Sequence, residues 1–122
     1  MSDYKKLKVW DYAHNYAIEI YKLTKDFPEE EKYGIISQLR RSSTSIPTNI
    51  VEGCGQIDNG NLVRFFDIAR GSAFESEYQL LLSKDLGFIS QEQYNIMNEK
   101  VKHIIRMLTK LIYSLKMSEN NK

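Results

Sequence analysis

Histidine, cysteine and carboxylate side chains most often bind metals or carry out catalysis, and this chain spaces them poorly for either role. A di-iron site in a helical bundle needs inward carboxylates and Glu-x-x-His pairs on facing helices. His14 and His103 fall in different helical segments, and neither follows a glutamate by three residues. Glu99 precedes His103 by four residues, which is the same side of a helix but the wrong spacing. We therefore predict no metal site and no cofactor.

Nucleophilic catalysis has little support in the sequence either. The single cysteine, Cys54, stands between Gly53 and Gly55 with no histidine nearby. No glycine-rich loop that could cradle a phosphate follows a predicted strand. A lone cysteine excludes an internal disulfide framework and is typical of a reducing cytoplasm. The sequence predicts a protein that is not an enzyme.

The segment 38–53 carries two stripes at helical spacing, one apolar or small and one polar. The first is formed by Leu39, Ser43, Ile46, Ile50 and Gly53. The second is formed by Gln38, Arg41, Ser45, Asn49 and Glu52. No charged residue stands between Arg41 and Glu52, which indicates a helix that packs on more than one side.

Polar residues of the second and third predicted helices have two interpretations. In the structural one, arginines and carboxylates pair within or between protomers and fix their register. In the other, the adjacent Arg40 and Arg41 form a ligand or nucleic-acid site. We favour the structural interpretation because buried charges are normally paired. The residues concerned are the stripe of Arg41, Ser45, Asn49 and Glu52 and the group of Arg70, Glu75 and Glu77.

A basic stripe marks the last predicted helix. Lys102, Arg106 and Lys110 recur at spacings of four, with His103 beside them. Between Ser90 and Met117, five lysines or arginines face two glutamates, a local charge of +3. One such stripe is usually a solvated helix face. Several copies around an axis would sum into a field that attracts phosphates, so these three cations are the predicted nucleic-acid-binding set.

Four long helices are needed to position these groups, and the periodicity predicts them over 9–26, 29–53, 61–86 and 90–115. Glu29, Glu30 and Glu31 suit the positive end of the second helix dipole, and Gly34 is expected inside that helix. Pro47 would either end the helix, with Ser45 capping a new one, or kink it. We favour a kinked, continuous helix because the apolar register is the same on both sides of Pro47.

Other local signals fix the remaining ends and faces. Gly87 is expected to cap the third helix, and Ser90 with Gln93 reads as a capping box for the fourth. In the first helix, Tyr12, Tyr16 and Tyr21 lie off the apolar stripe and are expected to cover core edges or to meet another chain.

Length and composition are those of a single domain over residues 1–122, with loose tails at 1–8 and 117–122. The apolar fraction is 42%, and no apolar run approaches the roughly 20 residues that span a bilayer. The start of the chain has no export signal, so we expect a cytoplasmic protein without membrane contact. The net charge of +1 gives no global field for nucleic acid. The predicted fold is all-α: an antiparallel up-down-up-down four-helix bundle with a proline-kinked second helix.

Three segments resemble a known family. They are YGIISQLRRSSTSIPTNIVEG (Tyr33 to Gly53), FFDIARGSAFESEYQL (Phe65 to Leu80) and DLGFI (Asp85 to Ile89). They are similar to bacterial four-helix-bundle proteins encoded by intervening sequences within 23S ribosomal RNA genes and by free-standing genes. The accessory variability proteins of diversity-generating retroelements look like more distant relatives. The resemblance spans about Val9 to Leu115.

The resemblance implies a four-helix protomer that assembles into a ring, a homopentamer. The retroelement relatives are basic and bind nucleic acid and their reverse transcriptase, whereas the activity of the intervening-sequence proteins is unassigned. The family supplies no catalytic residues. Its recurring polar positions match six residues here, which form the predicted structural network between helices or protomers: Arg40, Arg41, Asn49, Glu52, Arg70 and Glu75. With a net charge of +1, this chain is less basic than the retroelement relatives.

The sequence thus predicts a cytoplasmic, non-enzymatic homo-oligomer whose partner is RNA or a nucleic-acid-processing protein. The alternative is a protein–protein interaction scaffold that receives a partner on its tyrosine-bearing faces and small-residue grooves.

Overall fold

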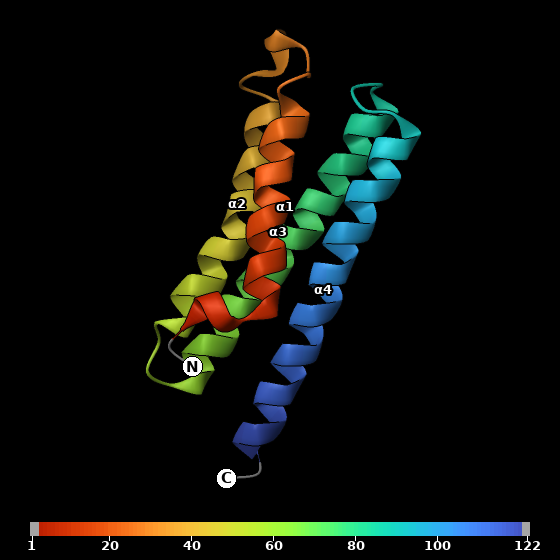
Figure 1. Cartoon of the computed structure of the whole chain (residues 1–122). Coiled ribbons are helices and arrows are strands. Elements are labelled where there is room, and N and C mark those ends of the chain that lie inside the picture. The colour runs from red at the N-terminus through yellow and green to blue at the C-terminus, as the bar shows by residue number, and fades with distance from the viewer. Residues whose placement is uncertain (1–2, 121–122) are drawn as a thin grey trace.

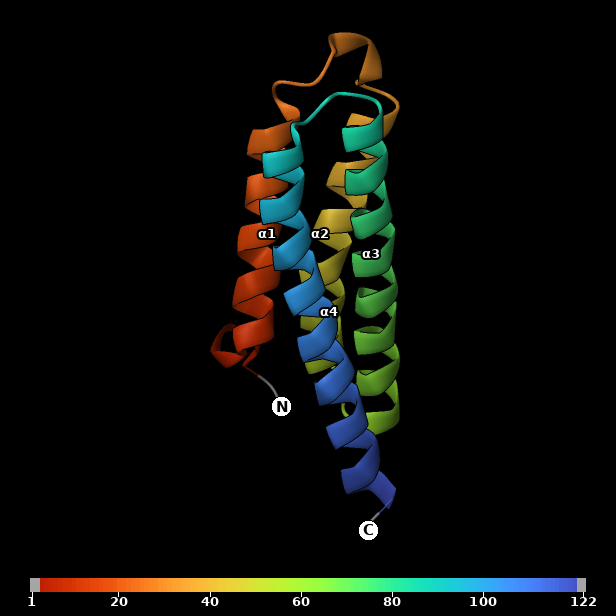
Figure 2. The same ribbon diagram turned by 90° about the vertical axis from the view of Figure 1, so that its right-hand side faces the viewer.

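Helices alone make up the computed structural model, which describes residues 3–120 and their side chains through residue 118 (Figure 1). The elements in order are η1 (Tyr4–Lys6), α1 (Lys8–Thr24), η2 (Glu29–Glu31), α2 (Ile35–Cys54), α3 (Asn59–Asp85) and α4 (Gln91–Asn120). The four long helices run alternately up and down, and each packs beside the next along the chain. Figure 2 shows α4 lying across the face between α1 and α3. The predicted all-α antiparallel four-helix bundle is confirmed.

The second helix is continuous through Pro47, as predicted. Side chains on both sides of the proline bond to backbone carbonyls one turn earlier. The Thr44 hydroxyl donates to the Arg40 carbonyl at 2.8 Å, and the Thr48 hydroxyl donates to the Thr44 carbonyl at 2.7 Å. The Asn49 amide donates to the Ser45 carbonyl at 2.8 Å. Hydroxyl bonds of this kind accompany helix bending, and here they lie on both sides of the proline.

The start of the second helix differs from the prediction. Glu29–Glu31 form the separate turn η2, and α2 begins at Ile35. Gly34, expected inside the helix, precedes it with a non-helical backbone (φ −105°, ψ −119°). Glycine is among the poorest helix formers, so a helical turn that reaches it ends there at little cost.

The chain ends also differ from loose tails. Tyr4–Lys6 form η1, capped by Asp3, and the Tyr4 ring packs edge-on against Trp10 at 5.1 Å. At the other end α4 continues to Asn120, past the predicted end at Leu115. Residues 1–2 and 121–122 of the expected tails lie outside the described residues.

The capping residues predicted from the sequence are found at the connection between α3 and α4. The Gly87 backbone has φ +82°, the left-handed conformation that favours glycine, and the Phe88 amide donates to the Ser83 carbonyl at 2.9 Å. The Ser90 amide donates to the Gln93 side chain and the Gln93 amide donates to the Ser90 hydroxyl, so the predicted capping box is confirmed.

The core follows the predicted apolar stripe of α2 but includes one unexpected tyrosine. Leu39, Ser43, Ile46 and Ile50 are fully buried, as predicted. Tyr16 was expected at an edge, yet it is 1% exposed because the small Ser76 of α3 leaves room for its ring and accepts or donates a 2.6 Å hydrogen bond. Among residues 3–120, no helix combines the length and the hydropathy that a bilayer span requires.

Candidate interaction surfaces

The predicted basic stripe forms one exposed face of α4. Lys102, Arg106 and Lys110 are all exposed and lie within about 12 Å along the helix axis, at 1.5 Å per residue. Arg106 approaches Glu99 at 4.0 Å, the limit of an ion pair, and both side chains are mostly in solvent. Within residues 3–118, Lys102 and Lys110 have no carboxylate within ion-pair distance. We call these three cations the α4 basic face.

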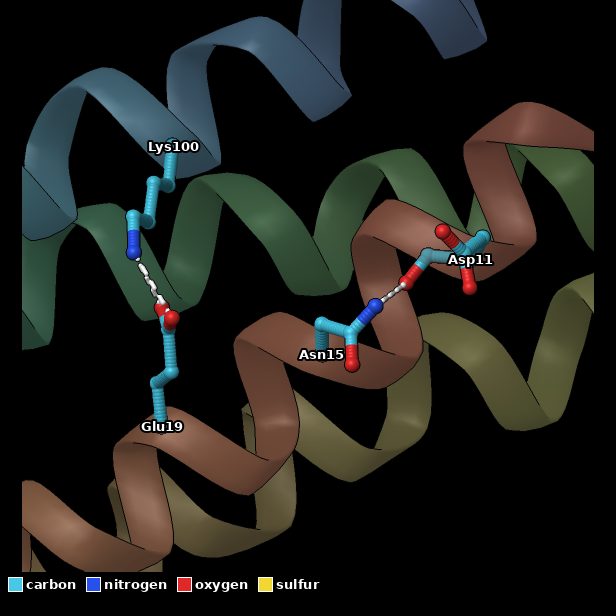
Figure 3. Close-up of polar contacts among 4 residues, drawn as sticks. All are labelled: Asp11, Asn15, Glu19 and Lys100. Atoms are coloured by element: carbon cyan, nitrogen blue, oxygen red, sulfur yellow. Dashed lines mark hydrogen bonds and ion pairs between the residues drawn. The ribbon is translucent and has the colours of Figure 1, made fainter.

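A neighbouring cation of α4 is neutralised by α1. The Lys100 ammonium lies 2.7 Å from both carboxylate oxygens of Glu19 (Figure 3). One turn further along α4, the His103 ring packs edge-on against Tyr12 at 4.8 Å. Lys100 therefore joins α4 to α1 and is not part of the α4 basic face.

Among the residues with described side chains, metal-binding and nucleophilic groups lie apart from one another. His14 stacks on Trp10 at 4.9 Å, whereas His103 contacts Tyr12. Within the described part of the chain, no three His, Cys, Asp or Glu side chains converge as metal ligands would. Burial raises the pKa of the Cys54 thiol, which keeps it protonated and weakens it as a nucleophile.

The predicted arginine–carboxylate pairs do not form within residues 3–118; two of the arginines bind hydroxyl groups on neighbouring helices. Arg40 donates from Nε to the Thr24 hydroxyl at 2.9 Å, and its guanidinium lies 4.6 Å from the Tyr21 ring centre. Arg70 donates from Nε to the Thr109 hydroxyl at 2.7 Å. Arg40 thus ties α2 to α1, and Arg70 ties α3 to α4.

Neutral groups, rather than charges, join α2 to α3. The Ser42 hydroxyl donates to Gln79 Oε1 at 2.7 Å, and Gln79 in turn donates to a Glu75 carboxylate oxygen at 3.2 Å. The Ser45 and Ser72 hydroxyls are 2.8 Å apart, and the Asn49 amide donates to the Ser45 hydroxyl at 3.0 Å. This seam contains two of the six residues of the predicted network, Asn49 and Glu75.

The polar pattern did not single out Gln79, which is 5% exposed at the centre of this seam. Its signal was its place on the inner face of α3, three residues after Ser76 and four before Ser83, both buried. Arg41 and Glu52, the remaining members of the predicted network, are exposed at the rim.

An open apolar groove lies between α1 and α2. Its volume is about 610 Å³, and its apolar walls are formed by Trp10, Ala17, Ile18, Tyr21, Pro47 and Val51. Lys22 and Lys25 line the end nearest the C-terminus of α1, and no carboxylate of residues 3–118 lines the groove. We call it the α1–α2 groove.

Exposed apolar residues also follow the outer face of α3. Phe74, Tyr78 and Leu81 are 45%, 61% and 36% exposed, and they follow Gly71 at helical spacing. A side-chain carbon added at Gly71 would meet no atom within 4 Å. We call these four residues the α3 ridge.

Comparisons with known proteins agree on one family. A family model described as 23S rRNA-intervening sequence protein matches residues 5–110. A crystal structure from Bacteroides thetaiotaomicron, of a protein with unknown function from the S23 ribosomal protein family, is 30% identical with a TM-score of 0.78. The match covers 85% of this chain and 97% of that one. No curated protein matches the chain.

Proposed function

The chain belongs to the 23S rRNA-intervening sequence protein family, and we propose that it is a non-enzymatic, homo-oligomeric bundle that binds RNA through the α4 basic face. The single observation that carries the proposal is the exposure of Lys102, Arg106 and Lys110 and their lack of close ion-pair partners among the described side chains. They share one exposed face, and two of them have no carboxylate partner within residues 3–118. The proposal places this activity in the cytoplasm.

The affinity of this face for RNA depends on oligomerisation. A single chain of net charge +1 offers three clustered cations, and binding of polyanions scales with the number of phosphates that are neutralised. The pentamer implied by the family resemblance would present fifteen such cations, three from each of five copies. The proposal therefore joins the basic face to self-association, and each part is testable alone.

The observations against catalysis support the non-enzymatic part of the proposal. The only cysteine of the chain is buried with a raised thiol pKa, and both histidines pack against aromatic rings. A catalytic acid, base or nucleophile instead needs access to substrate and a pKa suited to its task.

The test is the affinity for a fluorescein-labelled, single-stranded RNA, measured by anisotropy at several salt concentrations. Wild type is compared with a Lys102→Ala/Arg106→Ala/Lys110→Ala variant. A Lys5→Ala/Lys6→Ala/Lys32→Ala variant is the control, because it removes three exposed cations from other parts of the bundle. Equal affinity and equal salt dependence of wild type and the first variant would refute the assignment.

A protein-binding scaffold is the second candidate function, and the α1–α2 groove is the observation that favours it. An apolar groove of this size is suited to a helix with apolar anchors at i, i+3 and i+7. Salt distinguishes the two functions: phosphate contacts weaken steeply as salt rises, and an apolar interface does not.

A further inference from the structure

The α1–α2 groove and the α3 ridge are complementary surfaces of one chain that the chain cannot bring together itself. The groove lies between α1 and α2, and the ridge is formed by exposed residues of α3. The helix α3 itself packs against α2 and α4 (Figure 1). Taking the homo-oligomer of the proposed function as given, we propose that the occupant of the groove is the α3 ridge of a second copy of this chain.

The two surfaces lie at the same height along the bundle. The Tyr16–Ser76 hydrogen bond links residues 60 apart in sequence on α1 and α3, and both helices run upward. Since both rise 1.5 Å per residue, an offset of 60 relates the levels of α1 and α3. Phe74, Tyr78 and Leu81 therefore lie level with His14, Ile18 and Tyr21, which line the groove.

The ridge is also short enough to lie within the groove. The groove extends from Trp10 to Lys25, about 22 Å at helical rise, and the ridge from Gly71 to Leu81 covers about 15 Å. Gly71 presents no side chain at the lower end of the ridge, so a neighbouring backbone can approach closely there.

Charge favours the same register. Lys22 and Lys25 line the upper end of the groove, and the same offset places Asp85 of α3 level with Lys25. Asp85 is 62% exposed and has one weak partner among the described residues, the adjacent Lys84 at 3.5 Å. The exposed charged residues of α3 are Arg64, Asp67, Glu75 and Asp85, a net charge of −2. The half-buried Arg70, whose guanidinium lies 5.0 Å from the Phe74 ring centre, is at the other end of the ridge from Asp85.

A contact of this kind is heterologous, because different surfaces of the two copies meet. With both bundles parallel and at the same height, successive contacts rotate without advancing along the axis, which is the geometry of a closed ring. The contact buries aromatic side chains that a single copy leaves exposed, and it brings α4 faces of neighbouring copies into one assembly.

The decisive experiment mixes two damaged interfaces and measures mass by light scattering. A ridge variant, Phe74→Glu/Tyr78→Glu, keeps an intact groove, and a groove variant, Ile18→Glu/Val51→Glu, keeps an intact ridge. We expect each alone to be monomeric and their equimolar mixture to form a one-to-one dimer, since one intact contact remains. Ile96→Glu, at an exposed apolar residue on α4, should retain the wild-type mass.

Charge reversal provides a test that does not depend on the apolar substitutions. Lys25→Glu should weaken the wild-type assembly at least tenfold at low salt, and adding Asp85→Lys should restore it. A wild-type monomer would remove the proposed oligomer itself. A wild-type oligomer whose mass survives the ridge substitutions, or whose groove variant still assembles alone, would overturn this contact and leave the oligomer standing.

Discussion

The hydroxyl oxygens of Tyr16 and Ser76 lie 2.6 Å apart in the centre of the bundle, where both residues are at most 1% exposed. Their bond crosses from α1 to α3, which are not sequence neighbours in the bundle. A buried hydroxyl that loses its partner keeps its desolvation cost, so the pair stabilises the fold as a unit.

Removing one partner of this pair should therefore cost more than half of what removing both costs. We expect Tyr16→Phe and Ser76→Ala each to lower the free energy of unfolding by about 1–2 kcal/mol, and the double variant to lower it by less than their sum. Urea unfolding measures the cycle, and Tyr12→Phe, at a half-exposed tyrosine, should be neutral. Additive losses would mean that the two hydroxyls do not interact.

Alkaline pH should destabilise the protein through the same tyrosine. Burial raises the pKa of Tyr16 far above the value of about 10 that it has in the unfolded chain. Above pH 10 the unfolded chain therefore releases a proton that the folded chain retains. The contribution of Tyr16 is complete below pH 10 and falls by about 1.4 kcal/mol per pH unit above it.

The measurement is the unfolding free energy of wild type and Tyr16→Phe between pH 9 and pH 11. The variant should lose stability less steeply than wild type above pH 10. Parallel curves across that range would show that Tyr16 ionises as easily in the folded protein as in the unfolded chain.

Close packing at Gly53 makes a second prediction about stability. A side-chain carbon there would lie 2.9 Å from two ring carbons of Phe66, so Gly53→Ala should cost about 1–3 kcal/mol by overpacking. Gly71→Ala is the matched control, because its side chain meets no atom within 4 Å and alanine favours helix by about 1 kcal/mol. Both substitutions should be measured in the Phe74→Glu/Tyr78→Glu ridge variant, where contacts between subunits do not contribute to the free energy of unfolding. A neutral Gly53→Ala would mean that Phe66 can move aside.

The salt dependence of RNA binding should report the α4 basic face directly. Each phosphate contact contributes about 0.7 to the slope of log affinity against log salt for single strands. Loss of Lys102, Arg106 and Lys110 should reduce that slope by about 2 for each chain that contacts the RNA. The control that loses Lys5, Lys6 and Lys32 should keep the wild-type slope, and an equal reduction in both variants would indicate non-specific charge alone.

By contrast, Lys100 should matter little to RNA. Its ammonium is held between two carboxylate oxygens of Glu19, so Lys100→Ala should leave the RNA affinity within about twofold of wild type (Figure 3). Because the pair is more than a third exposed, the loss of stability should be under about 1 kcal/mol. A tenfold loss of RNA affinity, in a Lys100→Ala protein whose melting temperature equals that of wild type, would show that Lys100 belongs to the basic face.

Sequence patterns predicted the features that depend on local spacing. The buried stripe from Leu39 to Ile50 and the Ser90–Gln93 capping box each follow from residues within a few turns of one another. The face shared by Lys102, Arg106 and Lys110 follows from the same periodicity.

Features that depend on the neighbouring helix were not predictable in this way. Arg40 and Arg41 are adjacent in sequence, but successive residues of a helix point about 100° apart, so only Arg40 reaches Thr24 of α1. The buried places of Tyr16 and Gln79 depend on which small or polar residue stands opposite, Ser76 for one and Ser42 for the other. The separate turn at Glu29–Glu31 depends on the backbone conformation at Gly34, which charge and periodicity do not encode.

The central claim joins self-association to RNA binding, and the mass of the protein in solution tests both most directly. Light scattering should be run on wild type alone and with single-stranded RNA, at about 50 mM and at about 500 mM salt, conditions between which phosphate contacts weaken strongly. The account predicts a homo-oligomer whose mass rises with RNA at low salt and not at high salt. A monomer, or an oligomer whose mass is unchanged by RNA at both salt concentrations, would contradict it.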